Sequence, residues 1–360
     1  MLKLYKYRPL SEFLFKELFY QELFFASYIE LNDPFDLSAR MDFSIENEDQ
    51  LEALMFMLFK TTLILHEEDY TDVERLNNQG LLAFNDNDTE RNDFKTNLFK
   101  SLSEISHPGT VVTLDEVINQ ISNVSSSRPM GFNFDINKFI TEINRITQKF
   151  LQNSYTTCFS EDPANFLMWS HYASRHTGIC LEFTLNHGKF PYEKEGKRRI
   201  TEGAYENGFC KGIKEVFLFE DRIRAVDYKD VQPHINFFEF APVFQNEYDC
   251  DLIGLSKSKW HPYAYQLENV FATKTLPWSY EKEWRAISIN LDLPQEPEQR
   301  IKHYPIESLT GIFFGTRTPE QAKNRIAKIY KEKRHDLTYS SCKLSNGREL
   351  DFEPWEFFED

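Results

Sequence analysis

Two hydrophobic periods alternate along this chain, and the dominant period changes twice. Apolar residues at every second position predict strands, and apolar residues recurring every three or four positions predict amphipathic helices. Strand signals lie before residue 42 and after residue 151, whereas the stretch between them has helical periods separated by polar loops. We therefore predict an α+β core of residues 1–41 and 152–360 with a mixed or antiparallel sheet, and a large helical insertion at 42–151.

The individual elements follow from the same periods. Strands are expected near 2–8, 22–28, 154–160, 177–183, 216–219, 284–290, 311–315 and 337–350. Helices are expected near 11–20, 46–66, 88–105, 113–123, 135–151, 165–173, 249–273 and 319–334. Ser11 is placed to cap the first helix, because its hydroxyl can accept from an otherwise unpaired N–H of the first turn.

A turn is predicted at Asn32-Asp33-Pro34-Phe35-Asp36. Proline fixes φ there, and the Asn and Asp side chains can close the turn on their own backbone. We expect Asn32 and Asp36 to border a cleft, with Asp36 paired to Arg8 or Arg285 and Phe35 packed beneath it. An ordinary structural turn is the alternative.

Composition excludes several kinds of site. The chain has 33 Phe and 17 Tyr but only 13 Gly, and neither GxGxxG nor GxxxxGK[ST] occurs, so a Rossmann or P-loop nucleotide site has no support. Five scattered cysteines without a CxxC pair fit free thiols in a reducing cytosol, and neither a structural zinc nor another metal site is expected.

Location and partners are constrained by charge and hydropathy. The N-terminus lacks the apolar run of a secretory signal, and the longest apolar stretch, Leu51–Leu65, contains Glu52 and Lys60, so a cytoplasmic protein without a membrane span is expected. A formal net charge of −16 argues against a general nucleic-acid surface. Between Asp42 and Asp93 there are 14 acidic and 3 basic residues, so the insertion presents an acidic face, either solvated or contacting a partner protein.

Several separated motifs carry a family resemblance. They are Tyr5-Lys6-Tyr7-Arg8, the 32–36 turn, Cys158-Phe159-Ser160-Glu161, Met168 to Ala173 with Gly178 to Phe183, and Lys274 with Tyr280 to Arg285. In order and content they resemble the bacterial domain-of-unknown-function family 2971, over roughly 1–40 and 154–345. That resemblance implies no particular reaction.

A weaker similarity of layout links the chain to ADP-ribosyltransferase-like folds. Those folds place a basic or aromatic residue on a first strand, a hydroxyl-bearing motif on a middle strand, and Glu-x-Glu before a later strand. The similarity implies NAD as a substrate, with a carboxylate stabilising the oxocarbenium-like state that forms when the nicotinamide–ribose bond breaks.

The residues of such a site would divide by role. Glu283 is the favoured catalytic carboxylate, with Glu281 beside it, because Glu283 directly precedes a strand; His171 is the candidate acid–base histidine. Cofactor contacts would come from stacking by Tyr7, Trp169 and Tyr172, from pyrophosphate binding by Arg8 and Lys274, and from Ser160.

Each motif also has a plain structural interpretation. Glu-x-Glu beside Arg285 is common at salt-bridged strand ends, because a period of two places both acids on one face. Trp169 and Tyr172 have the spacing of a core stripe on one helical face. His171 can equally be a capping or buried, hydrogen-bonded histidine. His176 lies five residues after His171, which is the wrong spacing for two zinc ligands on one helical face.

The leading functional hypothesis is thus an ADP-ribosyltransferase-like enzyme that uses NAD to modify a macromolecule or hydrolyses NAD, in the setting of a toxin or a phage-defence effector. Two alternatives stay open. One is a non-catalytic interaction or sensor protein of a defence module, with the insertion as its partner surface. The other is a nucleic-acid hydrolase.

Overall fold

The chain divides into two compact units, each built from separate segments. The computed structural model describes residues 1–33, 35–37, 40–60, 89–107, 109–125, 134–186, 188–198, 205–206, 209–210, 213–231, 233–239, 268–289, 294–331, 333, 336–345 and 349–357. Unit 1 comprises Met1–Asp36, Asn153–Val231 and Ala272–Asp360, and unit 2 comprises Leu37–Gln152 and Gln232–Phe271. We had expected this second segment of unit 2 in the core domain.

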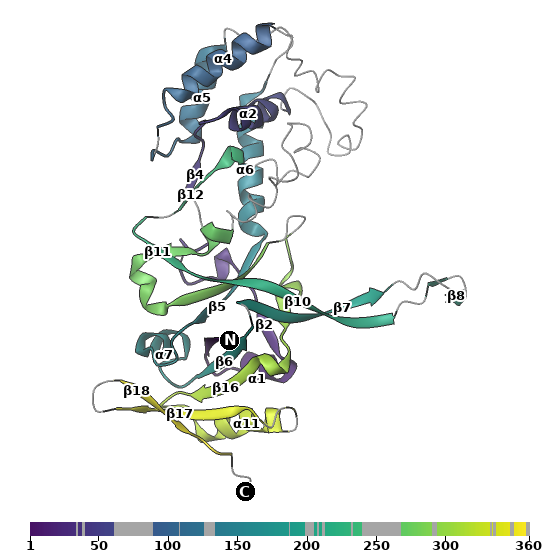
Figure 1. Cartoon of the computed structure of the whole chain (residues 1–360), viewed down its shortest axis with the longest axis vertical. Helices are drawn as coiled ribbons and strands as arrows, with labels where there is room; N and C mark the ends of the chain where they lie inside the picture. Colours follow the sequence, from purple (N-terminus) through teal and green to yellow (C-terminus); the bar gives the residue numbers. More distant parts are fainter. Residues whose placement is uncertain are drawn as a thin grey trace. The chain divides into compact units, whose positions relative to one another are not determined.

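A 12-stranded sheet organises the described part of unit 1 (Figure 1). Its strands are β1 (Leu2–Arg8), β2 (Glu22–Phe24), β3 (Ala26–Ser27), β5 (Ser154–Ser160), β6 (Ile179–Leu185), β7 (Lys189–Arg198), β10 (Ile213–Ala225), β14 (Glu283–Ile289), β15 (Ile301–His303), β16 (Leu309–Phe314), β17 (Thr338–Leu344) and β18 (Leu350–Pro354). The order is β18-β17-β16-β6-β1-β5-β14-β10-β7-β15-β2, with β3 on β5. Neighbours are antiparallel except for β16 and β17, so the predicted α+β class with a mixed sheet is confirmed.

The sheet opens between two of its central strands. β1 pairs with β6 along its whole length, but it pairs with β5 only at Tyr5 and Ser160. Beyond that pair, Lys6–Arg8 of β1 have no strand-pairing partner on β5. The two strands therefore separate at this end, which leaves room for a cavity.

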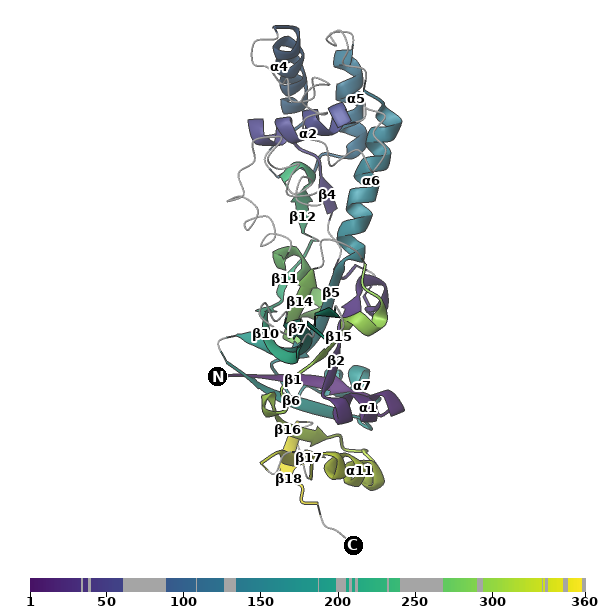
Figure 2. The ribbon, with the colours of Figure 1, turned by 90° about the vertical axis from the view of Figure 1, so that its right-hand side faces the viewer.

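Side chains on the two faces of β1 enter different apolar clusters, because successive residues of a strand point to opposite faces. Leu4 joins the cluster that holds α1 (Glu12–Tyr20) and α11 (Glu320–Lys331) on the sheet. Tyr7 joins a second cluster with Met168 and Trp169 of α7 (Phe166–Tyr172). Figure 2 shows α11 lying along β16 and β17. The expected Ser11 cap is confirmed, since its hydroxyl accepts from Leu14 N at 3.1 Å.

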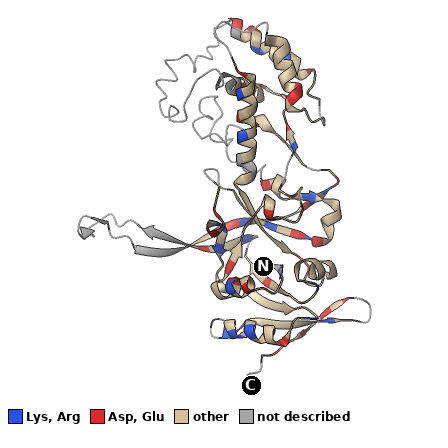
Figure 3. Ribbon diagram, turned by 180° about the vertical axis from the view of Figure 1, so that it is seen from behind, with Lys and Arg blue, Asp and Glu red and all other residues tan. Residues whose placement is uncertain are grey.

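Basic residues are frequent on α11 (Figure 3), and two basic side chains of this region contact α1. Arg325 pairs with Glu12 and lies 3.7 Å from the centre of the Phe15 ring. Lys333, just beyond the helix, lies 4.1 Å from the centre of the Phe19 ring. These residues thus contribute to packing between the two helices.

The remaining elements of unit 1 are short. They are β8 (Tyr205–Glu206), β9 (Phe209–Cys210), β11 (Asp227–Lys229), β13 (Thr273–Thr275) and the 3₁₀ turns η1 (Tyr28–Glu30), η5 (Leu276–Glu281), η6 (Pro297–Arg300) and η7 (Ile306–Ser308). β11 and β13 form a parallel pair. η5 runs directly into β14, and this junction carries both acids of Glu-x-Glu.

The described part of unit 2 is mainly helical. Its helices are α2 (Glu48–Lys60), α4 (Thr89–Ser103), α5 (Leu114–Val124) and α6 (Ile136–Gln152), which confirms four predicted helices over their described residues. A parallel pair joins β4 (Arg40–Asp42) to β12 (His234–Asn236), a strand too short to predict. The predicted helical stretches 61–66 and 249–267 lie outside the described residues. In the described part of the chain, no helix is long and apolar enough to cross a bilayer.

Candidate functional site

A cavity of about 370 Å³ lies in unit 1 at the place where β1 and β5 separate. Its walls come from β1, β5, the segment 30–36, α7 and the η5–β14 junction. Charged lining residues are Lys6, Arg8, Glu30, Asp36, Lys274, Glu281 and Glu283. This volume is within the range of small-molecule sites, roughly 300–1,000 Å³.

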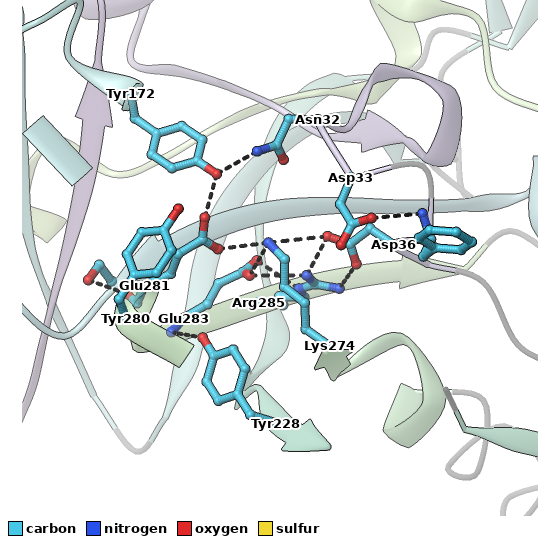
Figure 4. Close-up of polar contacts among 12 residues, drawn as sticks. Asn32, Asp33, Asp36, Tyr172, Tyr228, Lys274, Tyr280, Glu281, Glu283 and Arg285 are labelled. Atoms are coloured by element: carbon cyan, nitrogen blue, oxygen red, sulfur yellow. Dashed lines mark hydrogen bonds and ion pairs between the residues drawn. The ribbon is translucent and has the colours of Figure 1, made fainter. Parts of the chain in front are cut away.

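A network of buried charges forms one wall (Figure 4). The fully buried Arg285 donates from its two terminal nitrogens to Asp36, at 2.6 and 2.7 Å. It also donates to both oxygens of Glu283, from Nε at 2.7 Å and from a terminal nitrogen at 3.0 Å. Arg285 therefore holds the turn segment and the start of β14 together, as expected for Asp36.

Lys274 completes the network from β13. Its Nζ lies 2.7 Å from Glu281, 3.2 Å from Glu283 and 3.5 Å from Asp36. Burial lowers the pKa of Lys274, but these three carboxylates outweigh burial and raise it above the usual value. A phosphate at this ammonium would face three acids, so the expected pyrophosphate role of Lys274 does not fit the structure.

Glu281 and Glu283 have different environments. Burial alone would raise the pKa of Glu283, but Arg285 and Lys274 more than offset it and hold that pKa at about 2. For Glu281, burial and the neighbouring Glu283 outweigh the attraction of Lys274, and its pKa is raised. Glu283 thus stays ionised down to low pH, whereas Glu281 gains its proton at a higher pH.

The backbone between the two acids explains why both reach the network. Glu281 ends η5, Lys282 adopts a left-handed conformation with φ 44°, and Glu283 opens β14. Ser160 supports this junction, because its buried hydroxyl donates to the Glu281 carbonyl at 2.7 Å. The period of two that we invoked for Glu-x-Glu is therefore not the cause, since only Glu283 belongs to the strand.

A chain of hydrogen bonds connects Glu281 to the 30–36 segment. Tyr172 donates to Glu281, and Asn32 Nδ2 donates to the Tyr172 hydroxyl at 2.8 Å. Asn165 caps α7 by accepting from two first-turn N–H groups, and its amide also donates to the Tyr280 carbonyl. The cap thereby fixes α7 against η5, which places Tyr172 beside Glu281.

The structure brings most of the predicted site residues to one cavity. Those that line it are Tyr7, Arg8, Asn32, Asp36, Tyr172, Lys274, Glu281 and Glu283. Ser160, Trp169, His171 and Arg285 are not among its lining residues.

Four expectations need correction. Trp169 is fully buried and packs edge-on against Tyr7, so it cannot stack on a ligand ring. Ser160 is fully buried, and its hydroxyl donates to the Glu281 carbonyl, so it does not face a cofactor. His171 is exposed beside the Tyr280 ring, outside the cavity. Phe35 is 64 % exposed and does not pack beneath Asp36.

Lys6 is a lining residue that the sequence interpretation missed. It belongs to the Tyr5–Arg8 motif, and simple alternation along a strand places it on the face opposite the tyrosines. Its Nζ donates to Thr157 Oγ1 at 2.8 Å and to the Cys158 carbonyl at 3.0 Å. Only the separation of β1 from β5 makes this position a cavity wall.

The comparisons with known proteins bear on this same region. Residues 168–286 match a family described as "Protein of unknown function (DUF2971)". The resemblance inferred from the motifs is thereby supported for this stretch of the chain. No curated protein and no solved structure matches the chain. The DUF2971 stretch contains Tyr172, Lys274, Glu281 and Glu283, whereas β1 and the turn segment precede it.

Within the described residues, no cluster of three or more His, Cys, Asp or Glu could hold a metal ion.

Proposed function

We propose that this cavity binds NAD and that the protein cleaves the nicotinamide–ribose bond, passing the ADP-ribosyl group to a macromolecule or to water. The observation that carries this proposal is the position of Glu281. Its carboxylate lines the cavity and accepts a hydroxyl hydrogen bond from the partly buried Tyr172. A ribose hydroxyl can replace the Tyr172 hydroxyl as that donor.

Glu281 suits the catalytic role better than Glu283, which we favoured from the sequence. Both oxygens of Glu283 already accept from Arg285, and one also contacts Lys274. Glu281 has one cationic partner and one neutral hydroxyl partner. A carboxylate with a replaceable neutral partner can turn toward substrate without breaking the buried network.

The chemistry follows from charge. As the C–N bond breaks, its electron pair goes to the nicotinamide nitrogen and cancels the positive charge of the ring. Positive charge then develops on the ribose, where a nearby carboxylate stabilises it. The acceptor bonds to the ribose carbon and releases its proton. Tyr5, Tyr7 and Tyr172 supply aromatic lining for a flat ring.

The test is incubation with NAD labelled in either half, followed by detection of nicotinamide and of modified macromolecules. Glu281→Gln should fold and lose roughly 10²–10³-fold in turnover, the scale for one electrostatic contact to a transition state. Glu161→Gln is the matched control, because this exposed acid lies just after β5 and is not a lining residue. Full activity of Glu281→Gln would remove Glu281 from the mechanism. Absence of NAD binding and turnover in wild-type protein would favour an interaction or sensor role.

A further inference from the structure

A second charged region lies in the same cavity, on the β1 side. Lys6 is partly buried, and its two hydrogen bonds go to a neutral hydroxyl and a neutral carbonyl. It forms no ion pair with any residue that the structure describes. Burial, followed by the nearby Arg8, lowers the pKa of Lys6 to about 8. Its ammonium is therefore mostly protonated at neutral pH, and the carboxylates of Glu17 and Glu283 attract it without forming a direct ion pair.

Arg8 adds an unused donor. Two residues along a strand lie on the same face, about 6.5 Å apart, so Arg8 follows Lys6 on that face, and both line the cavity. The terminal nitrogen of Arg8 donates to both oxygens of Glu17. Arg8 Nε is buried and has no hydrogen-bond partner among the described residues.

The cavity is thus polarised. Its carboxylate wall holds Asp36, Glu281 and Glu283 around Lys274, whereas the β1 wall presents the Lys6 ammonium, which has no ion pair among the described residues, beside the Arg8 side chain. A matching ligand carries anionic oxygens at one end and hydroxyl groups or a positive ring at the other. Phosphate oxygens accept from such donors in charge-assisted hydrogen bonds.

We propose that Lys6 and Arg8 form an anion subsite that binds a phosphate group of the substrate. In the proposed function this group is part of the diphosphate of NAD, and to that extent the inference rests on that function. In this arrangement the lysine that holds phosphate is Lys6, and not Lys274 as expected from the sequence. The nicotinamide ribose then lies toward Glu281.

Inorganic pyrophosphate is the probe, because its binding tests the subsite without any turnover. Isothermal titration calorimetry should show binding to wild-type protein. Lys6→Met should weaken that binding roughly tenfold or more, the effect of losing a hydrogen bond to a charged group, and Lys6→Arg should retain most of it. Lys3→Met is the matched control, since Lys3 is an exposed lysine of the same strand paired with Glu182.

A labelling experiment covers the case in which Lys6→Met fails to fold. Reductive methylation of folded wild-type protein, read by mass spectrometry, should modify Lys6 more slowly when pyrophosphate is present and leave the rate at Lys3 unchanged. Equal rates at Lys6 with and without pyrophosphate would overturn the subsite. So would a Lys6→Met protein that binds pyrophosphate as tightly as wild type, or wild type that binds none at millimolar concentration.

The outcomes separate this inference from the proposed function. Pyrophosphate binding that depends on Lys6, in a protein that does not cleave NAD, supports the subsite and defeats the function. If wild type and Lys6→Met cleave NAD with the same KM and wild type binds no pyrophosphate, the proposed function is supported and the subsite is overturned. If both hold, Lys6→Met should weaken NAD binding and leave the affinity for phosphate-free nicotinamide riboside unchanged.

Discussion

Asp36 and Arg285 form a two-point ion pair, with nitrogen–oxygen distances of 2.6 and 2.7 Å, although 249 residues separate them in the chain. Both side chains are almost completely buried. The pair fixes the turn segment beside the start of β14, so the cavity wall depends on it.

Asp36→Asn should destabilise unit 1 by about 3 kcal/mol. Removing one partner of a buried ion pair typically costs about 3–5 kcal/mol, and Glu283 still compensates part of the Arg285 charge here. Urea denaturation measures the change. Asp162→Asn, which loses a partly exposed contact to Lys282, is the control and should cost less than about 1 kcal/mol. Equal stability of wild type and Asp36→Asn would contradict this prediction and would mean that the turn does not depend on the Asp36 charge.

Glu283 should make the stability depend on pH in the acid range. Its pKa in the folded protein is about 2, below the usual 4.5, so the folded state binds this proton less readily than the unfolded chain. The stabilisation is complete above pH 4.5 and is lost as pH falls toward 2; it amounts to about 3 kcal/mol.

The measurement is the free energy of unfolding at several pH values from 5 to about 2.5. Glu283→Gln should be less stable than wild type at neutral pH and should show a flatter profile in this acid window. Parallel profiles for wild type and Glu283→Gln would contradict the assignment. Glu281→Gln should not flatten this window, since the pKa of Glu281 is raised.

Tyr172→Phe should shift the activity profile without unfolding the protein. The Tyr172 hydroxyl stabilises the ionised form of Glu281 and so lowers the pKa of Glu281. Its removal should raise that pKa further, so the acid limb of NAD turnover moves to higher pH. Tyr280→Phe, on the neighbouring η5 turn, is the control and should leave the limb in place. An unshifted limb in Tyr172→Phe would mean that Glu281 does not control it.

Ser160→Ala should distinguish positioning from ligand contact. The buried hydroxyl donates to the Glu281 carbonyl and accepts from Asp162 N, so its loss leaves backbone groups without a partner, at a cost of about 1–3 kcal/mol. Because Ser160 does not line the cavity, kcat for NAD cleavage should fall while KM stays close to wild type. A raised KM with unchanged kcat would instead place Ser160 against the substrate.

Much of the local structure followed from the sequence. Alternation predicted the strands that became β1, β5, β6 and β14 to within about two residues, and helical periods predicted the described helices of unit 2. The side-chain chemistry at Ser11 also acts over a few residues only, which is why it could be predicted. Most nominated site residues line the cavity, because charged and aromatic side chains concentrate in a few short motifs.

Roles within the site were decided by contacts between distant segments. The spacing of the motif indicated a salt bridge with Arg285, but it did not show that Glu283 has two cationic partners and Glu281 only one. Lys6 became a cavity residue because β1 leaves β5 after a single pair, and Trp169 became core because Tyr7 packs against it. By itself the sequence determined which elements form and which residues carry charge, since both depend on neighbours along the chain. Only the tertiary structure decided which charges are buried together, because the network is completed when distant segments meet, as Asp36 meets Arg285 across 249 positions.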